Sequence, residues 1–337
     1  MLLDLGYRLA RPLLFQLDAE KAHERVLHVA GSAPGLFEAL AGQAPRPASL
    51  ACDLAGLKLP SPIGLAAGLD KDAHCIGLWP RLGFGFVELG TVTPRPQIGN
   101  PRPRIWRLVD ERAVINRMGF PSAGMAAVRQ RMERQRARGW PDAPVGLNLG
   151  KNKETSADDA WQDYATLAEG LAELADFFTV NLSSPNTPGL RALQKAEPMK
   201  RILGGVLERA GDLPVFLKLS PDLGDEDLEA SLETALAAGV SGIVATNTTL
   251  SRPGSTGRGG HEGGLSGAPL WPLASQRVKR VLEVVAGRAP VVGVGGISTA
   301  AQARELLDAG CTAVQLFTGF IYGGPGLPRR LNAGLAS

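Results

Sequence analysis

From about residue 60 onward, short apolar runs alternate with helix-like stretches, and this alternation constrains the fold more than any other feature. Such near-continuous apolar runs are typical of strands that are buried on both faces of a parallel sheet. Each run is closed by glycine or a polar residue. The eight runs are Ile63–Ala67, Phe86–Leu89, Val145–Leu149, Phe177–Leu182, Val215–Leu219, Gly242–Ala245, Val291–Val294 and Ala313–Phe317.

Eight strand–helix units in about 275 residues match the usual size of a closed (β/α)8 barrel, which is roughly 250 residues plus insertions. A doubly wound open sheet is the alternative, but such sheets rarely use eight units of this regularity. We therefore predict an α/β fold, a (β/α)8 TIM barrel with a small N-terminal helical extension. The helices predicted between strands are 71–81, 121–138, 157–175, 196–210, 225–238, 272–286 and 299–309.

The first 45 residues do not follow this pattern. Leu2, Leu5 and Leu9 share one face of a predicted helix, which should break at Pro12, and a further helix follows around residues 26–30. The helices could form a cover packed on the barrel, or an apolar surface that contacts a membrane or an apolar substrate. We expect a helical extension over residues 1–45 and a catalytic barrel over residues 46–337.

Two insertions interrupt the barrel pattern. In the first, Arg104–Leu108 and Ala113–Asn116 flank a polar turn, which predicts a β-hairpin. The second, Ser251–Ser266, is rich in glycine and is predicted to be a mobile loop.

Charge and composition exclude several classes of protein. A net charge of +3 is too small to indicate a nucleic-acid partner. Cys52, Cys75 and Cys311 are isolated, and the four histidines form no metal-binding pair, so neither a disulfide framework nor a metal site is predicted. No apolar stretch approaches the roughly 20 residues that span a bilayer.

Polar side chains gather where the predicted strands end, which is where a barrel of this kind places its active site. The group is rich in amides and poor in carboxylates and histidines. Because an asparagine side chain offers a donor and an acceptor together, it matches the edge of a cyclic imide. The amides in question are Asn116, Asn148, Asn181, Asn186 and Asn247.

Lys218 and two glycine-rich segments indicate an anionic ligand. Lys218 lies inside the apolar run VFLKLS, where an ammonium is costly unless an anion compensates it. It could face an anionic cofactor, form a Schiff base, or extend its side chain to the strand end. The segments 293–298 and 317–326 follow the seventh and eighth strands, where barrels commonly bind phosphate. FMN and a sugar phosphate both fit.

Several longer motifs resemble the dihydroorotate dehydrogenase family, in its quinone-dependent, membrane-associated class (class 2). Two features indicate that class: Ser184 stands where the soluble class carries cysteine, and an N-terminal extension contains FQLDAEKAH (15–23). The motifs are AAGLDKD (66–72), GTVTPRPQIGNPRPR (90–104), NRMGF (116–120), NLSSPNTPGLR (181–191), ATNTT (245–249), GGLSG (263–267) and GVGGIS (293–298).

The resemblance implies one FMN per chain and assigns roles to individual residues. Ser184 would be the base at substrate C5, with Thr187 and Phe120 near its proton exit. The residues implied to contact FMN are Ala67, Gly68, Leu69, Asp70, Lys71, Thr91, Asn148, Asn181, Lys218, Thr246, Gly267, Gly296, Phe317 and Thr318. Those implied to contact the substrate are Lys71, Asn116, Arg117, Met118, Gly119, Phe120, Asn181, Asn186, Asn247 and Thr248.

The implied activity is oxidation of (S)-dihydroorotate to orotate in de novo pyrimidine biosynthesis, with hydride passing to FMN and electrons to a membrane quinone. The quinone would enter between the N-terminal helices near His23 and Arg107. The resemblance also implies a monomer or homodimer, peripherally attached to the cytoplasmic face of the inner membrane. Phe317 departs from the tyrosine expected there.

Two other functions remain compatible with the residues alone. One is a phosphosugar lyase or isomerase on the same barrel, with Lys218 as the Schiff-base residue. The other is a non-enzymatic module that docks on a membrane or a partner through its N-terminal helices. The polar strand ends argue against the second.

Overall fold

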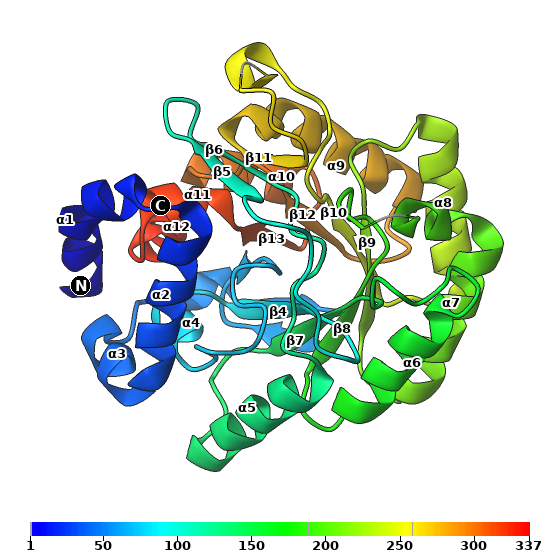
Figure 1. The fold of residues 1–337 in the computed structure, drawn as a ribbon, viewed down its shortest axis with the longest axis horizontal. Coiled ribbons are helices and arrows are strands. Elements are labelled where there is room, and N and C mark those ends of the chain that lie inside the picture. The colour runs from blue at the N-terminus through cyan, green and yellow to red at the C-terminus, as the bar shows by residue number, and fades with distance from the viewer. Residues whose placement is uncertain (1, 188, 258) are drawn as a thin grey trace.

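The computed structural model describes residues 2–187, 189–257 and 259–337, and it confirms the predicted barrel. The eight strands are all parallel and close in the order β10–β12–β13–β3–β4–β7–β8–β9 (Figure 1). Their bounds are β3 Ile63–Leu65, β4 Phe86–Val92, β7 Val145–Leu149, β8 Phe177–Asn181, β9 Val215–Leu219, β10 Gly242–Ala245, β12 Val291–Val294 and β13 Ala313–Leu316.

Large rings fill the barrel interior near the strand starts. Phe86, Phe177 and Phe216 pack together there. Glycines on neighbouring strands leave the space that the rings occupy: a Cβ at Gly64 would lie 2.3 Å from the Phe86 ring, and one at Gly146 would lie 2.3 Å from the Phe177 ring. The strand starts are thus closed by hydrocarbon, which leaves the opposite end for chemistry.

An unpredicted hairpin covers the same closed end. Strands β1 (Cys52–Leu54) and β2 (Leu57–Leu59) pair in antiparallel fashion. Leu54 and Leu59, both fully buried, join the cluster formed by the phenylalanine rings. Both strands are only three residues long, too short for a hydrophobic period to reveal them in the sequence.

Helices surround the barrel, mostly where the sequence predicts them. The prediction of a helix over 71–81 is wrong except for its last turn. The buried Asp70 carboxylate accepts the backbone N–H groups of His74 at 2.7 Å and Cys75 at 2.8 Å, which holds this segment in turns. The outer helices are α4 Leu78–Arg81, α5 Met125–Arg138, α6 Ala160–Leu171, α7 Ala196–Ala210, α8 Asp225–Ala238, α9 Trp271–Val285, α10 Ala300–Asp308, α11 Thr318–Gly323 and α12 Leu327–Ala336.

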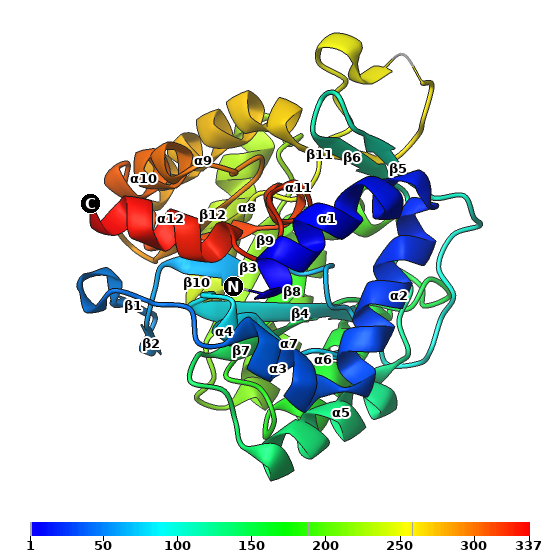
Figure 2. The same ribbon diagram turned by 90° about the vertical axis from the view of Figure 1, so that its left-hand side faces the viewer.

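Three further helices precede the barrel and lie along one side of it (Figure 2). Helix α1 continues through Pro12, so the predicted break there is wrong. Proline removes only the hydrogen bond to the carbonyl of Arg8. Both residues are exposed, so water can satisfy that carbonyl. The bounds are α1 Leu2–Gln16, α2 Ala19–Ser32 and α3 Pro34–Ala41.

Ion pairs and hydrogen bonds fasten these helices to the barrel. On α2, Glu20 pairs with Arg104 at 2.6 Å, and the two side chains are only 4% and 5% exposed. On α1, the buried Asp4 accepts the backbone N–H of Gly326 at 2.9 Å, just before α12. The extension therefore has a fixed place on the barrel.

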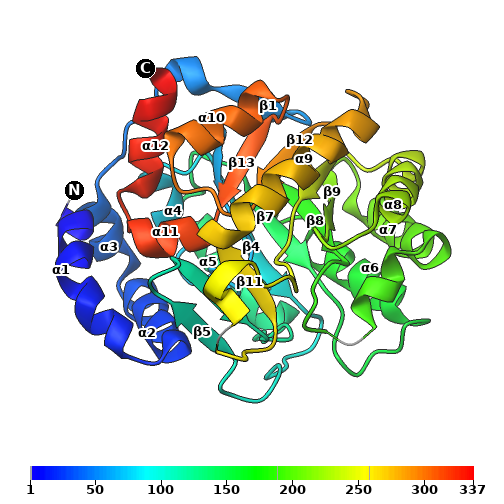
Figure 3. The same cartoon turned by 90° about the horizontal axis from the view of Figure 1, so that it is seen from above.

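The two insertions meet in one three-stranded sheet. Strands β5 (Ile105–Leu108) and β6 (Ala113–Asn116) form the predicted hairpin, and β11 (Gly264–Gly267) pairs with β6. Seen from above, this sheet lies in front of the barrel strands (Figure 3). The second insertion thus contains a strand, which the prediction of a mobile loop missed. Leu265, fully buried with Ala113 and Ile115, fixes that strand on the hairpin.

Candidate active site

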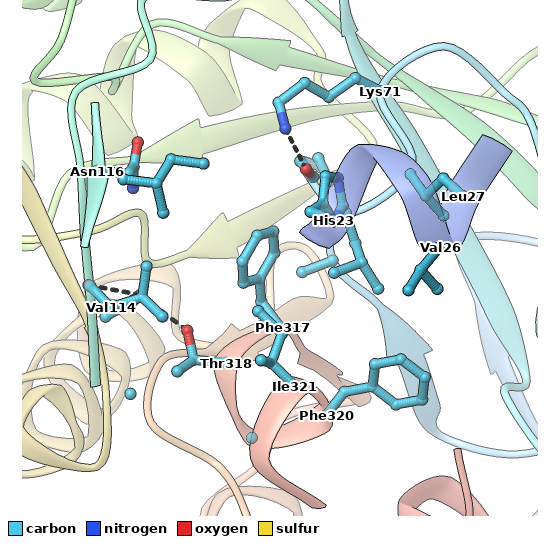
Figure 4. A pocket seen from close by; sticks show the side chains of 18 of the residues that line it. His23, Val26, Leu27, Lys71, Val114, Asn116, Phe317, Thr318, Phe320 and Ile321 are labelled. Carbon is cyan, nitrogen blue, oxygen red and sulfur yellow. Dashed lines mark hydrogen bonds between the residues drawn. The ribbon is translucent and has the colours of Figure 1, made fainter. Parts of the chain in front are cut away.

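One cavity of about 770 Å³ runs from the carboxyl ends of the barrel strands to the N-terminal helices. Polar side chains line the barrel end and apolar side chains line the helix end. Figure 4 shows Lys71 and Asn116 in the cavity wall together with Phe317, and Val26 and Leu27 on helix α2. The cavity therefore joins two chemically different compartments in one space.

Most residues that the sequence suggested for a cofactor do line this cavity. Two do not. Asp70 is buried in the turns described above, and Asn148 is buried behind the wall. The suggested cofactor residues in the wall are Ala67, Gly68, Leu69, Lys71, Thr91, Asn181, Lys218, Thr246, Gly267, Gly296, Phe317 and Thr318.

The residues suggested for the substrate gather at the polar end, with one exception. Arg117 is not in the wall: its guanidinium lies 5.6 Å from the centre of the Trp106 ring and 3.8 Å from the Glu262 carboxylate. The others in the wall are Lys71, Asn116, Met118, Gly119, Phe120, Asn181, Asn186, Asn247 and Thr248.

The amides at the polar end hold one another in place. Asn186 donates to the side-chain oxygen of Asn116 at 3.1 Å and to its backbone oxygen at 3.0 Å. Asn247 donates to the Ser183 hydroxyl at 3.0 Å. Since each amide is oriented by a neighbour, the wall presents fixed donors and acceptors to a ligand.

Ser184 is buried and lies in the cavity wall, on the loop after β8. Its oxygen accepts the backbone N–H of Asn186 at 3.3 Å. Among the described residues, no histidine or carboxylate is hydrogen-bonded to Ser184, so the paired base of an acyl-transfer serine is missing there. Nearby on the same loop, the buried Thr187 hydroxyl also lacks a partner within the described chain. Proton transfer suits this serine better than nucleophilic attack.

Lys218 presents a positive charge to the cavity. It is buried, and no carboxylate of the described residues pairs with it, although an unpaired buried ammonium is costly. An anionic ligand in the cavity would compensate it. The reduced isoalloxazine ring of a flavin is such an anion, so the donor set fits a flavin cofactor.

Glycines form part of the wall at the loops after β12 and β13, beside Ile297 and Thr318. A Cβ at Gly296 would lie 2.7 Å from the Trp271 backbone nitrogen, and one at Gly319 would lie 2.1 Å from the Ile297 carbonyl oxygen. Gly296 also has a φ of +75°, which L side chains rarely adopt. Glycine at both positions lets these loops pack main chain against main chain. Both glycines also line the cavity, so the wall there offers backbone groups to a ligand, which fits the phosphate of FMN.

Two titratable groups lie between the compartments. Lys71 donates to the Gly68 carbonyl at 2.6 Å, and burial lowers its pKa to about 8 against the opposing attraction of Asp72. Burial also lowers the pKa of His23 to about 3, with the positive charge of Lys71 adding to the effect. Near neutral pH, Lys71 is therefore mostly charged and His23 is neutral.

The helix end of the cavity is lined mostly by apolar side chains, such as Leu14 and Val26, with Arg107 among them. Arg107 donates to the backbone oxygen of Leu14 at 2.9 Å, and its guanidinium lies 4.8 Å from the centre of the Phe15 ring. On the outer surface of α1, Leu9 and Leu13 are 72% and 68% exposed. No helix in the described part of the chain is long and apolar enough to cross a membrane.

Sequence reasoning missed three residues near the site. Glu88 and Gln315 lie inside the barrel and are hydrogen-bonded to each other at 2.5 Å, and Glu20 holds α2 to the hairpin. Glu88 carried a usable signal, because an acid within the apolar run Phe86–Leu89 must have a buried partner. The partner of Glu20 is 84 positions away, and no local pattern marks it.

Comparison with known proteins places this geometry in a family. The family model of dihydroorotate dehydrogenase matches residues 49–337, which covers the whole barrel. The chain belongs to the dihydroorotate dehydrogenase family. This membership confirms the resemblance carried by the motifs, and the match begins only after the three N-terminal helices.

Relatives of nearly equal length extend the match through those helices. The chain is 47% identical to the dihydroorotate dehydrogenase (quinone) of Novosphingobium aromaticivorans, over 98% of this chain and 94% of the relative. It is 49% identical to the protein of the same name from Anaeromyxobacter dehalogenans, over 97% and 91%. Among solved structures, Eimeria tenella dihydroorotate dehydrogenase in complex with ferulenol superposes with a TM-score of 0.88 at 35% identity, covering 96% and 93%.

Proposed function

We propose that this chain oxidises dihydroorotate to orotate, with FMN as its flavin and a membrane quinone as the electron acceptor. The observation that carries the proposal is the single cavity that joins an amide-lined polar end to an apolar end in a member of the dihydroorotate dehydrogenase family. A polar substrate and an apolar acceptor each have a matching compartment. The quinone in the names of the relatives supports the choice of acceptor.

FMN would lie across the barrel mouth and supply hydride acceptance at its ring. Lys218 would stabilise negative charge on that ring, since no described carboxylate neutralises the ammonium. The backbone around Gly296 and Gly319, which leaves no room for side chains, would hold the phosphate. Thr91 and Asn181 would face the ring from the cavity wall.

The substrate would lie at the polar end, against the interlocked amides. Asn116, Asn186 and Asn247 would hold the pyrimidine ring through paired donors and acceptors, which is a positioning role. Lys71 would attract the substrate carboxylate, because the ammonium remains mostly charged near neutral pH.

Ser184 would remove the proton from substrate C5. A serine hydroxyl is a weak base in water, so its contribution depends on the closed, dry loop in which it is buried. General-base assistance of this kind is typically about 10²–10⁴-fold. Thr187, whose buried hydroxyl has no partner in the described chain, and Phe120 would lie along the path by which the proton leaves.

The helices of residues 1–45 would form the quinone-access domain, with the catalytic domain over residues 46–337. The exposed leucines on α1 would lie in the membrane interface on the cytoplasmic side, so that a quinone could move from the lipid into the apolar compartment past His23 and Arg107. This arrangement needs no membrane-spanning segment, and the chain would be a peripheral membrane protein.

An anaerobic absorption spectrum tests the proposal. The purified chain, or the chain reconstituted with FMN, should show flavin bands that dihydroorotate bleaches and that a short-chain quinone then restores. Succinate, a dicarboxylate without the ring, is the control and should leave the bands unchanged. A chain that binds no FMN, or whose bound FMN is not bleached by dihydroorotate, would overturn the proposed function.

A further inference from the structure

A fully buried carboxylate lies in the barrel interior, behind the cavity wall. Glu88, on β4, accepts hydrogen bonds from the Asn148 amide nitrogen at 2.7 Å and from the Gln315 amide nitrogen at 2.5 Å. No lysine or arginine of the described residues forms an ion pair with it. Each Glu88 oxygen accepts from one of these amides, so the NH₂ side of both amides faces Glu88.

The contact with Asn148 fixes the other end of that amide. Because the Asn148 nitrogen donates to Glu88, the Asn148 oxygen faces away from Glu88. It accepts from the Thr91 hydroxyl at 2.5 Å and from the Asn181 amide nitrogen at 3.0 Å. If Asn148 were rotated by half a turn, its NH₂ would meet the NH₂ of Asn181, and both groups would be donors. Glu88 therefore holds the Asn148 amide in this orientation from the side of the barrel interior.

The loop that carries Ser184 requires the same orientation of Asn148 from the cavity side. The oxygen of Asn181 accepts the backbone N–H of Ser183 at 3.2 Å, and a backbone N–H can only donate. That contact turns the Asn181 nitrogen toward Asn148. The hydrogen bonds thus run in one direction, from a backbone donor on the Ser184 loop down to Glu88.

The direction matters because Thr91 and Asn181 line the cavity, whereas Glu88 and Asn148 do not. The Thr91 hydrogen is used by Asn148, and the Thr91 oxygen accepts the Asn181 amide nitrogen at 3.3 Å. Toward a ligand, Thr91 therefore has only its remaining lone pair to offer, as an acceptor. Without an acceptor at position 88, the buried Asn148 NH₂ has no partner in this orientation. If it turns toward Thr91 instead, it meets the Asn181 NH₂ and displaces that amide, and Thr91 then presents a donor to the ligand.

We propose that Glu88 is a positioning residue for the cofactor site: through Asn148 it makes Thr91 present an acceptor, and holds the Asn181 amide, toward FMN in the cavity. This inference rests on the proposed binding of FMN. We assign this positioning role to the oxygen atoms of residue 88 as hydrogen-bond acceptors, because the Glu88 side chain does not line the cavity.

Three variants of the full chain separate hydrogen-bond acceptance at position 88 from packing of the barrel interior. The readouts are the dissociation constant and the visible spectrum of bound FMN. Glu88→Met keeps the length and removes the acceptor, and it should weaken FMN binding by about tenfold or more and shift the flavin bands, because a buried donor loses its partner. Glu88→Gln keeps an acceptor for Asn148 and should stay within about threefold of the unchanged chain, with its bands in place.

Thr179→Val is the matched packing control. Thr179 lies beside Asn148 in the strand register, is fully buried, and its hydroxyl has no hydrogen-bond partner in the described chain. The valine variant should bind FMN as the unchanged chain does. Equal losses in Thr179→Val and Glu88→Met would overturn the inference, because packing would then explain both.

Two further outcomes would also overturn it: a Glu88→Met chain that binds FMN normally, or a Glu88→Gln chain that loses as much as the methionine variant. If Glu88→Met does not fold, Asn148→Leu removes the same contact from its other end, and normal FMN binding there would contradict the inference. Failure of the unchanged chain to bind FMN would instead refute the proposed function.

Discussion

The barrel mouth and the N-terminal helices line the same cavity but are built differently. At the mouth, polar groups such as Asn148, Asn181 and Ser184 are buried, and each is hydrogen-bonded to a neighbour. On the helices, large apolar side chains such as Leu9 and Leu13 stay exposed to solvent. The mouth is thus preorganised for one polar ligand, whereas the helices depend on an apolar surrounding that the chain itself does not supply.

The polar contacts of the N-terminal helices go to the hairpin and to the outer helices rather than to the amides and Ser184 of the barrel mouth, so each region can be disturbed separately. Glu20 ties α2 to the hairpin through Arg104, and Asp4 ties α1 to the start of α12. The comparison predicts that changes at the mouth alter the dihydroorotate reaction alone. Changes on the helices should alter quinone use or membrane binding alone.

The largest effect is expected at Ser184. Ser184→Ala should slow flavin reduction by dihydroorotate about 10²–10⁴-fold, because the variant lacks the base for C5. Stopped-flow bleaching of the flavin measures this step. Reoxidation of the reduced flavin by a short-chain quinone should be unchanged, since Ser184 is on the polar side. Near-normal bleaching would refute the assigned role, and slower reoxidation would contradict the separation of the regions.

Glu20→Ala tests the connection between the regions. Removing the carboxylate leaves Arg104 buried without its ion-pair partner, which typically costs about 3–5 kcal/mol of unfolding free energy. Denaturant unfolding measures the loss. Glu24→Ala is the matched control on the same helix: Glu24 pairs with Arg102 with both side chains half exposed, so its loss should stay below about 1 kcal/mol. Equal effects would show that burial does not distinguish the two pairs.

Leu9→Ser combined with Leu13→Ser tests the membrane proposal. Each leucine buried in a lipid interface contributes about 1.5–3 kcal/mol, so the double variant should bind anionic lipid vesicles at least about 100-fold more weakly. Vesicle co-sedimentation measures this. Flavin bleaching by dihydroorotate should be unaffected, because the barrel mouth is intact. Unchanged vesicle binding would show that Leu9 and Leu13 do not insert into the lipid interface.

The smallest effect is expected from the titration of Lys71. The ammonium is charged below its pKa of about 8 and neutral above it, so attraction of the substrate carboxylate is lost as pH rises through that value. The KM for dihydroorotate should be constant below pH 7 and rise by up to about tenfold per pH unit above pH 8. Lys71→Arg keeps the charge and should abolish the rise. A KM that does not change with pH in the unchanged chain would contradict the role of Lys71 in attracting the substrate carboxylate.

The barrel could be predicted because each strand is short, apolar and local, and six of the eight begin and end within one residue of the predicted runs. The polar residues at the strand ends were also visible, since a parallel barrel brings these ends together. Several features depend on contacts between distant segments and were not visible. Examples are β11 joining the hairpin, the Asp70 turns that replace a helix, and the inward direction of Glu88.

The contact between Asp4 and Gly326 links a helix that precedes the barrel to a segment that follows its last strand. A ribosome makes α1 before the barrel and α12 after it, and domains generally assemble as their parts are released. Helix α1 therefore cannot form its contact with Gly326 until all eight barrel strands have been synthesised. During that time its exposed leucines are available to a chaperone or to a membrane surface.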